Sequence, residues 1–149
     1  LILLALGLTI TTISALFEEI IWRGYYHNRL RKTYSFHKTA FMIALIWSIW
    51  HFPIALLYKD YTNLIIGIIS YLVILFLTSY LLSYLRERSD SIIPATFFHG
   101  LMNVFYFGDG VQIHLSLHMI ELTKCIILSM FFVVIYITIQ YFKPGSRGY

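Results

Sequence analysis

Residues 1–26 read LILLALGLTITTISALFEEIIWRGYY, and this stretch indicates what kind of protein the chain forms. The first 17 residues carry no charge, and Glu18, Glu19 and Arg23 follow directly. An apolar run of this length can cross a bilayer as a helix, and a charge near its centre costs roughly 2.5–3.5 kcal/mol on insertion scales. Charges placed there against this cost indicate a polar site with a function, because intramembrane ionisable residues are rarely without one.

The rest of the chain has the composition of a membrane protein. It is 59% hydrophobic and 12% charged, with a mean hydropathy of +0.76, which lies outside the range of ordinary soluble domains. Four more runs lack Asp, Glu, Lys and Arg, namely residues 39–58, 61–85, 91–108 and 125–142. The sequence therefore predicts an all-α membrane protein, a bundle of about five transmembrane helices with a polar site inside it. We expect residues 1–149 to form a single core, with further helices upstream because the chain begins at Leu1 without Met.

The basic residues alternate between the connections. Eight Lys and Arg residues fall in the first loop, the third connection and the tail, and two fall in the alternate connections, where Lys59 and Lys124 lie. Positive charge is retained on the cytoplasmic side, so these three segments are predicted to be cytoplasmic: Arg29, Arg31, Lys32, Lys38; Arg86, Arg88; Lys143, Arg147. The net charge of +4 therefore reports topology in a lipid membrane. No nucleic-acid partner is expected, because the charges do not line one exposed face.

Three ionisable residues from different predicted helices converge in depth. Counting along each helix from its expected cytoplasmic end places Glu18 at about 13 Å, His99 at about 12 Å and His51 at about 18 Å. Intramembrane Glu and His are scarce. Their convergence predicts one shared polar pocket that opens towards the cytoplasm.

Helical spacing divides the two acids between two roles. Glu19 and Arg23 are four residues apart with the acid first, which is the favourable order for an ion pair on a helix. Glu18 is rotated about 100° from Glu19 and has no partner on its own helix. We therefore expect Glu19 and Arg23 to form a structural pair and Glu18 to be free to exchange protons.

The same spacing groups the polar residues of the later helices. His99 and Asn103 share one helix face, and Trp47 and His51 share another. Pro53 lacks a backbone donor and is expected to kink its helix beside His51. The glycines Gly67 and Gly100 are expected to permit close helix packing.

Together these segments resemble a known family. Residues 18–24 (EEIIWRG), 47–53 (WSIWHFP) and 91–103 (SIIPATFFHGLMN) are similar to three motifs of the CPBP (Abi) intramembrane proteases: EExxxR, an aromatic residue followed at the fourth position by His, and HxxxN. That family includes the CAAX prenyl endopeptidases and bacteriocin-processing or self-immunity proteins. The resemblance covers about residues 8 to 106. Trp47 stands where the family often has Phe.

The resemblance implies a peptide-hydrolysing site. In it Glu18 would activate the attacking water, His51 would assist or position that water, and His99 with Asn103 would stabilise the oxyanion. It implies a peptide or protein substrate, either lipidated or a bacteriocin-like precursor. The residue types support this reading independently, since hydrolysis needs a base, oxyanion donors and an acid for the leaving amine.

Other functions stay open at this level. Glu18, His51 and His99 could instead hold a divalent ion such as zinc with an open water position, although the HExxH arrangement of soluble enzymes is absent; a metal-free glutamate mechanism is favoured. A family member without activity would act as a self-immunity or regulatory binding protein. A proton-coupled carrier would use buried Glu and His as a relay, but two symmetric halves are not evident. The Ile- and Tyr-rich composition favours a bacterial cell membrane.

Overall fold

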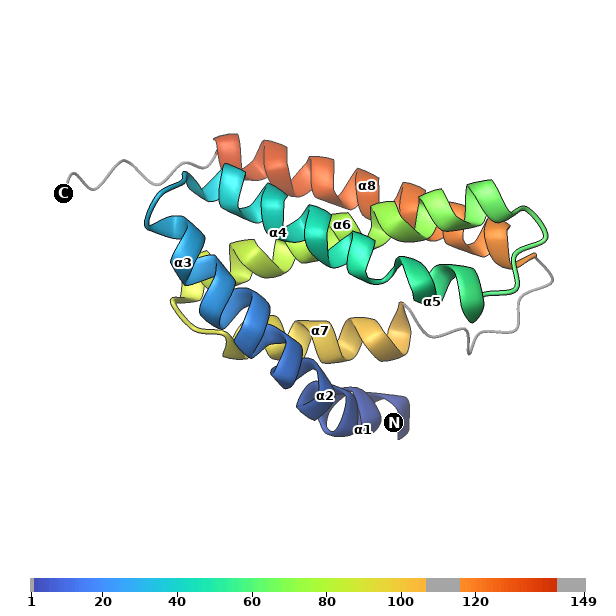
Figure 1. Ribbon diagram of the computed structural model, residues 1–149, viewed down its shortest axis with the longest axis horizontal. Coiled ribbons are helices and arrows are strands. Elements are labelled where there is room, and N and C mark those ends of the chain that lie inside the picture. The colour runs from blue at the N-terminus through green and yellow to red at the C-terminus, as the bar shows by residue number, and fades with distance from the viewer. Residues whose placement is uncertain (1, 107–115, 142–149) are drawn as a thin grey trace.

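The computed structural model describes residues 2–106 and 116–141 of the chain, and every regular element within these ranges is helical (Figure 1). The basic tail residues Lys143 and Arg147 lie outside the described residues. The elements are α1 (Ile2–Leu8), α2 (Ile10–Glu19), the π-helix η1 (Ile20–Tyr26), α3 (His27–Arg31), α4 (Phe36–Trp50), α5 (Phe52–Leu57), α6 (Leu64–Ser89), α7 (Ile93–Phe105) and α8 (Leu117–Tyr141). The all-α prediction is confirmed.

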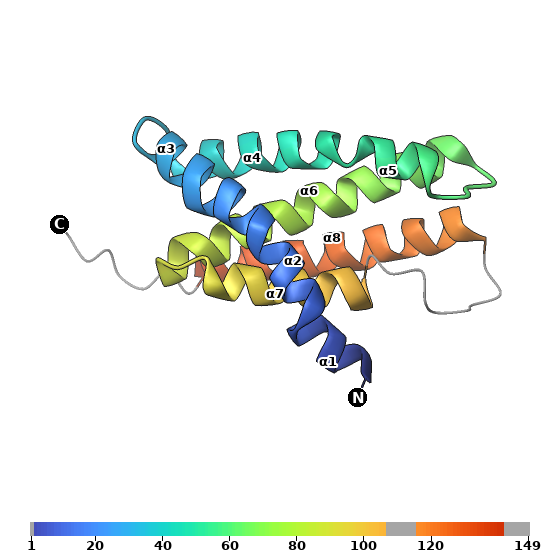
Figure 2. The same cartoon turned by 60° about the horizontal axis from the view of Figure 1, so that its bottom comes forward.

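Helix α6 is the centre of the bundle. It contacts α4, α8 and α7, while α1 and α2 pack across α7 (Figures 1 and 2). Four segments are long and apolar enough to cross a membrane, namely Ile2–Arg31, Phe36–Leu57, Leu64–Ser89 and Leu117–Val134. The fifth expected span is shorter, because α7 has 13 residues and a length of about 20 Å. The chain is thus a membrane bundle of four span-length segments with one shorter helix packed among them.

Burial in this bundle differs from that in a soluble protein, because charged side chains are fully buried while many large apolar side chains are exposed. Glu19 and Arg23 are 0% exposed, whereas Ile2 is 78% exposed and Ile65 is 71% exposed. In lipid, apolar side chains gain nothing by leaving the surface, while polar groups must find partners within the protein. The exposed apolar faces are therefore the lipid-facing surface, and the polar groups collect inside.

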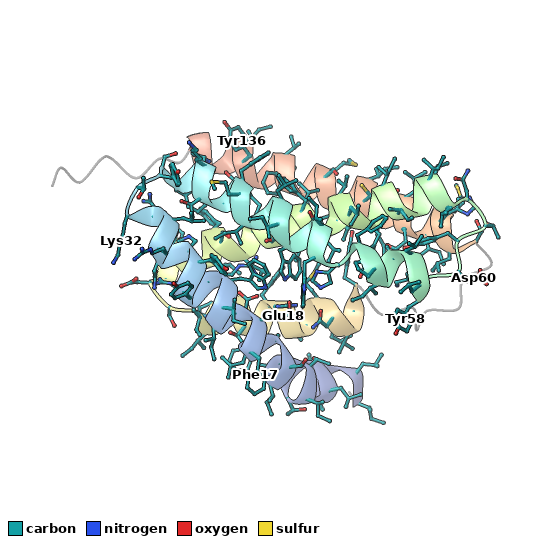
Figure 3. All side chains as sticks on the ribbon, viewed as in Figure 1. Phe17, Glu18, Lys32, Tyr58, Asp60 and Tyr136 are labelled. Atoms are coloured by element: carbon teal, nitrogen blue, oxygen red, sulfur yellow. The ribbon has the colours of Figure 1, made fainter. Side chains whose placement is uncertain are left out.

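The loops meet in the two groups that the charge pattern predicts. Arg31 forms an ion pair with Glu87 at 2.9 Å, and Arg86 donates to Asn28 Oδ1 at 3.0 Å, so the ends of α3 and α6 adjoin. Lys59 and Glu121 are paired at 3.6 Å where the loop after α5 meets α8. Figure 3 shows Lys32 and Asp60 at opposite ends of the bundle.

The first helical segment continues further than the sequence suggests. It is predicted to end near His27, but α3 extends it to Arg31. Glu18 therefore lies about 20 Å from that end along the helix rather than about 13 Å. The carboxylate is correspondingly closer to the middle of the bundle, as Figure 3 shows.

A break at Pro53 confirms the predicted kink. Helix α4 ends at Trp50 and α5 begins at Phe52, with Pro53 in its first turn. The His51 N–H bonds the Ser48 carbonyl at 3.1 Å, and the His51 carbonyl accepts from Ile54 N at 3.0 Å. Because proline has no N–H to continue the ladder, the helix restarts here and His51 occupies the joint.

Gly100 allows α7 to lie against the N-terminal segment. A Cβ atom at this position would be 2.7 Å from Thr12 Cα and 2.8 Å from the Gly7 carbonyl oxygen. The Thr11 hydroxyl donates to the Gly100 carbonyl at 2.8 Å. The close-packing role predicted for Gly100 is confirmed. Gly67 differs, because it faces the ring of Tyr61 rather than a second helix.

Candidate active site

The first motif coincides with a change of helix type. Regular α-helical spacing predicts a continuous α-helix through Arg23, but residues Ile20–Tyr26 form a π-helix that begins directly after Glu19. The His27 N–H bonds the Trp22 carbonyl, five residues earlier. Short π-helical segments are rare and frequently occur at functional sites. Arg23, the basic residue of the first motif, lies within it.

Glu19 connects two motifs rather than one. Arg23 Nη1 donates to Glu19 Oε1 at 2.9 Å, and the same oxygen lies 2.8 Å from His99 Nδ1. Arg23 Nη2 donates to the carbonyl and the hydroxyl of Ser79 on α6, at 2.8 and 2.6 Å. The predicted Glu19–Arg23 pair is therefore confirmed, and the carboxylate has a second role. It holds the imidazole of His99, which sequence spacing cannot reveal because the contact joins different helices.

Glu18 has no hydrogen-bonding partner on its own helix, as expected, but it has one on α4. Trp47 Nε1 donates to Glu18 Oε2 at 2.9 Å. The backbone carbonyl of Trp47 lies 2.8 Å from His51 Nδ1. Helical spacing leaves Glu18 unpaired on its own helix, and the neighbouring helix α4 supplies a donor that this spacing could not show.

Trp47 is the point at which the three motifs meet. Its side chain is 0% exposed. Its ring centroid is 4.5 Å from that of His51 and 5.4 Å from that of His99, with the rings tilted or edge-on. The Arg23 guanidinium carbon lies 5.4 Å from the same ring centroid. The predicted convergence of Glu18, His51 and His99 is therefore built around one indole.

Asn103 follows His99 by one helical turn on α7 and is half-buried. Its spacing places it on the His99 face of that helix. Within the described part of the chain its amide makes no hydrogen bond. It is the one member of the predicted site that the structure does not tie to the others.

Glu18 also borders a depression in the lipid-facing surface. This hollow has a volume of about 270 Å³ and is lined by Phe17, Glu18, Ile21, Trp22 and Trp50. Phe17 and Trp50 are 67% and 56% exposed. The carboxylate is the single ionisable group among these lining residues, so an apolar segment entering from lipid would meet it directly.

The two site histidines are each engaged through Nδ1, which leaves Nε2 of each ring available, as is usual for metal-ligating histidines. Nδ1 of His99 faces Glu19, and Nδ1 of His51 faces a backbone carbonyl. Among the described residues, no group of three or more His, Cys, Asp or Glu side chains is placed to hold a metal. In the described part of the chain, Glu18, His51 and His99 are thus not grouped as a preformed three-ligand site.

Comparison with known proteins identifies the family to which the chain belongs. The sequence profile described as "Type II CAAX prenyl endopeptidase Rce1-like" matches residues 1–105. "CAAX prenyl protease 2" of Methanococcus maripaludis is 33% identical over 98 residues, which cover 62% of this chain and 36% of that protein. The match thus spans about a third of the curated relative. No solved structure matches the chain significantly. Because the matched region contains all three motifs and the helices that carry them, the chain belongs to the Rce1-like family of type II CAAX prenyl endopeptidases.

Proposed function

We propose that this chain carries the catalytic core of an intramembrane endopeptidase that hydrolyses a peptide bond near the cytoplasmic side of the membrane. The observation that carries the proposal is the arrangement around Trp47. Its indole holds Glu18, its carbonyl holds His51, and its ring contacts His99. A polar cluster that served packing alone would have no reason to leave a carboxylate at the edge of an apolar, lipid-facing depression.

In this proposal Glu18 and His51 hold the attacking water between them. A carbonyl oxygen can only accept, so the contact with Trp47 requires the proton on Nδ1 of His51. In the neutral ring, Nε2 is then an acceptor. The two hydrogens of one water can be directed at Glu18 and at this nitrogen. Glu18 takes the proton as the water oxygen attacks the carbonyl carbon of the substrate.

His99 and Asn103 stabilise the oxyanion that forms. Nδ1 of His99 donates to the Glu19 carboxylate, so its Nε2 donates to an oxyanion when the ring carries both protons. The Glu19 charge lies where it offsets that imidazolium, and Arg23 anchors Glu19 in turn. The Asn103 amide supplies a second donor. Glu18 then returns its proton to the leaving amine, which completes the hydrolysis.

The substrate we propose is a peptide or protein with a lipidated segment. The curated relative is named for CAAX prenyl protease activity, and the depression beside Glu18 is apolar and faces lipid. A lipid-modified peptide would partition into the membrane and approach from this side. A bacteriocin-like precursor is the other substrate class, and the assay below includes a peptide that represents it. A bacterial origin for the chain stays a prediction.

The experiment is a cleavage assay on the purified protein in lipid nanodiscs. The substrates are matched peptides with and without a prenylated cysteine, together with a hydrophobic leader peptide, each assayed with and without a chelator. We expect Glu18→Gln to reduce cleavage to background while melting stays near the parent value, because the amide still accepts from Trp47 but cannot take a proton. We expect His51→Ala to be inactive as well.

Glu87→Gln is the matched control, since it changes a carboxylate at the end of the bundle, away from the proposed site. It should cleave at the parent rate. Cleavage by Glu18→Gln at the parent rate would refute the proposed mechanism. An inactive parent that still protects cells from a bacteriocin would instead establish a binding protein.

A further inference from the structure

The tryptophan at position 47 can do something that a phenylalanine there could not. Indole carries an N–H donor, and in this chain it points at Glu18 Oε2 at 2.9 Å. Phenylalanine has no polar atom. A phenylalanine at position 47 would therefore change the hydrogen bonding of the proposed base while leaving an aromatic ring in the core.

We infer that Trp47 is a positioning residue that holds the Glu18 carboxylate in its reactive orientation through the indole N–H; the inference rests on the endopeptidase function proposed above. One carboxylate oxygen is occupied by the indole, so the other is left to take the proton from water. The half-buried Glu18 side chain would otherwise be free to turn among rotamers beside the lipid-facing depression. Holding a reacting group in place lowers the entropy that the reaction must lose.

The indole is itself held on several sides. Ring contacts with His51 and His99, together with the Arg23 guanidinium over the ring, fix its plane. It is fully buried, so water does not compete for the N–H. The donor therefore keeps one direction, and the orientation of Glu18 follows from it.

One residue thus binds both groups that we propose to hold the attacking water. The side chain of Trp47 binds Glu18, and its backbone carbonyl binds His51. A change confined to the side chain alters the first contact and leaves the second available. This separation allows the hydrogen bond to be tested by itself.

A donor to the ionised carboxylate stabilises that form over the protonated one. Removing the indole N–H removes that stabilisation. Arg23 on η1 and His51 at the end of α4 also interact electrostatically with Glu18, and Glu19 and His99 lie beside them. These groups are unchanged in the variant below, so any difference reports the indole alone.

The test replaces Trp47 with benzothienylalanine by nonsense suppression in the full chain. This residue keeps the shape of the bicyclic ring and has sulfur in place of N–H. We expect kcat to fall about tenfold or more, because the carboxylate is no longer held in its reactive orientation, while KM stays near the parent value. The acidic limb of the kcat/KM profile should move to higher pH. Trp47→Phe should show the same shift together with some loss of stability from reduced volume.

A second measurement does not depend on activity. Dicyclohexylcarbodiimide modifies protonated carboxyl groups in apolar surroundings, and mass spectrometry of the Glu18 peptide follows its labelling against pH. The labelling curve should move to higher pH in the benzothienylalanine variant, with the Glu87 peptide as internal control. Superimposed curves, or an unchanged kcat in the variant, would overturn the inference. If the parent cleaves no peptide, the endopeptidase proposal fails on its own, and the labelling still decides whether the indole controls Glu18.

Discussion

Two ion pairs in this protein join the same residue types, Arg and Glu, at the same N–O distance, but they lie in different surroundings. Glu19–Arg23 at the site and Arg31–Glu87 at the end of the bundle each have an N–O distance of 2.9 Å. The side chains of the first pair are 0% exposed, and those of the second are 34% and 31% exposed. The distance between the charges therefore does not distinguish them, but their access to water does.

The difference shows how a polar site can be kept inside an apolar bundle. At the exposed pair, water replaces a lost partner, and such pairs are typically worth about 0–1 kcal/mol. At the buried pair, removing one partner strands the other, at a cost of about 3–5 kcal/mol. Glu19 is also shared by His99, so the buried pair supports the catalytic geometry as well as the fold.

The largest effect expected from this comparison is a loss of folding stability when the buried pair is broken. We predict that Arg23→Ala lowers the free energy of unfolding by about 3–5 kcal/mol, because it leaves Glu19 buried without its cation. Glu19→Gln should destabilise in the same direction and should also impair cleavage through His99. Unfolding in mixed detergent micelles, followed by circular dichroism, measures both. Parent-like yield and melting for both variants would contradict a structural role for the pair.

A substitution of Asn103 tests whether this half-buried amide, which has no hydrogen-bond partner among the described residues, belongs to the site. We predict that Asn103→Ala lowers kcat by about 10²–10³-fold, the typical loss for one oxyanion donor, and leaves melting near the parent value. Some activity should survive because His99 remains. Single-turnover cleavage measures the effect. An equal loss of activity and stability would assign Asn103 to helix packing instead.

The helix contact that brings His99 to Glu19 should be sensitive to a single methyl group. We predict that Gly100→Ala destabilises by about 1–3 kcal/mol, because its Cβ would meet the backbone of Thr12 at 2.7 Å. Gly24→Ala is the matched control, since its Cβ would lie 3.6 Å from the Glu19 carbonyl oxygen, an ordinary contact. Thermal melting compares the two. A Gly100→Ala variant as stable as Gly24→Ala would show that the helices can separate without cost.

The smallest effect is expected at the exposed pair. We predict that Glu87→Gln changes stability by no more than about 1 kcal/mol at low salt, with a smaller difference at high salt, because exposed charges are screened. Melting at two salt concentrations measures it. A loss that is large and independent of salt would mean that this pair is as important as the buried one.

Features that arise within one helix were predictable. Apolar runs predict membrane helices, because hydropathy is a sum over adjacent residues. The Glu19–Arg23 pair and the break at Pro53 also follow from local spacing and backbone chemistry, and both are found in the structure. The residue types of the three motifs, including Glu18, His51 and His99, were enough to indicate a polar site.

Contacts between helices were decided by the tertiary structure alone. The Trp47–Glu18 and His99–Glu19 hydrogen bonds join residues 29 and 80 positions apart, and no periodicity in the sequence relates such positions. The π-helix after Glu19 and the short length of α7 were also not anticipated. The physical reason is that hydropathy and helical spacing act along one segment. Which polar groups finally pair depends on how side chains from different segments pack, and here that depends on a close approach at Gly100 and on one buried indole.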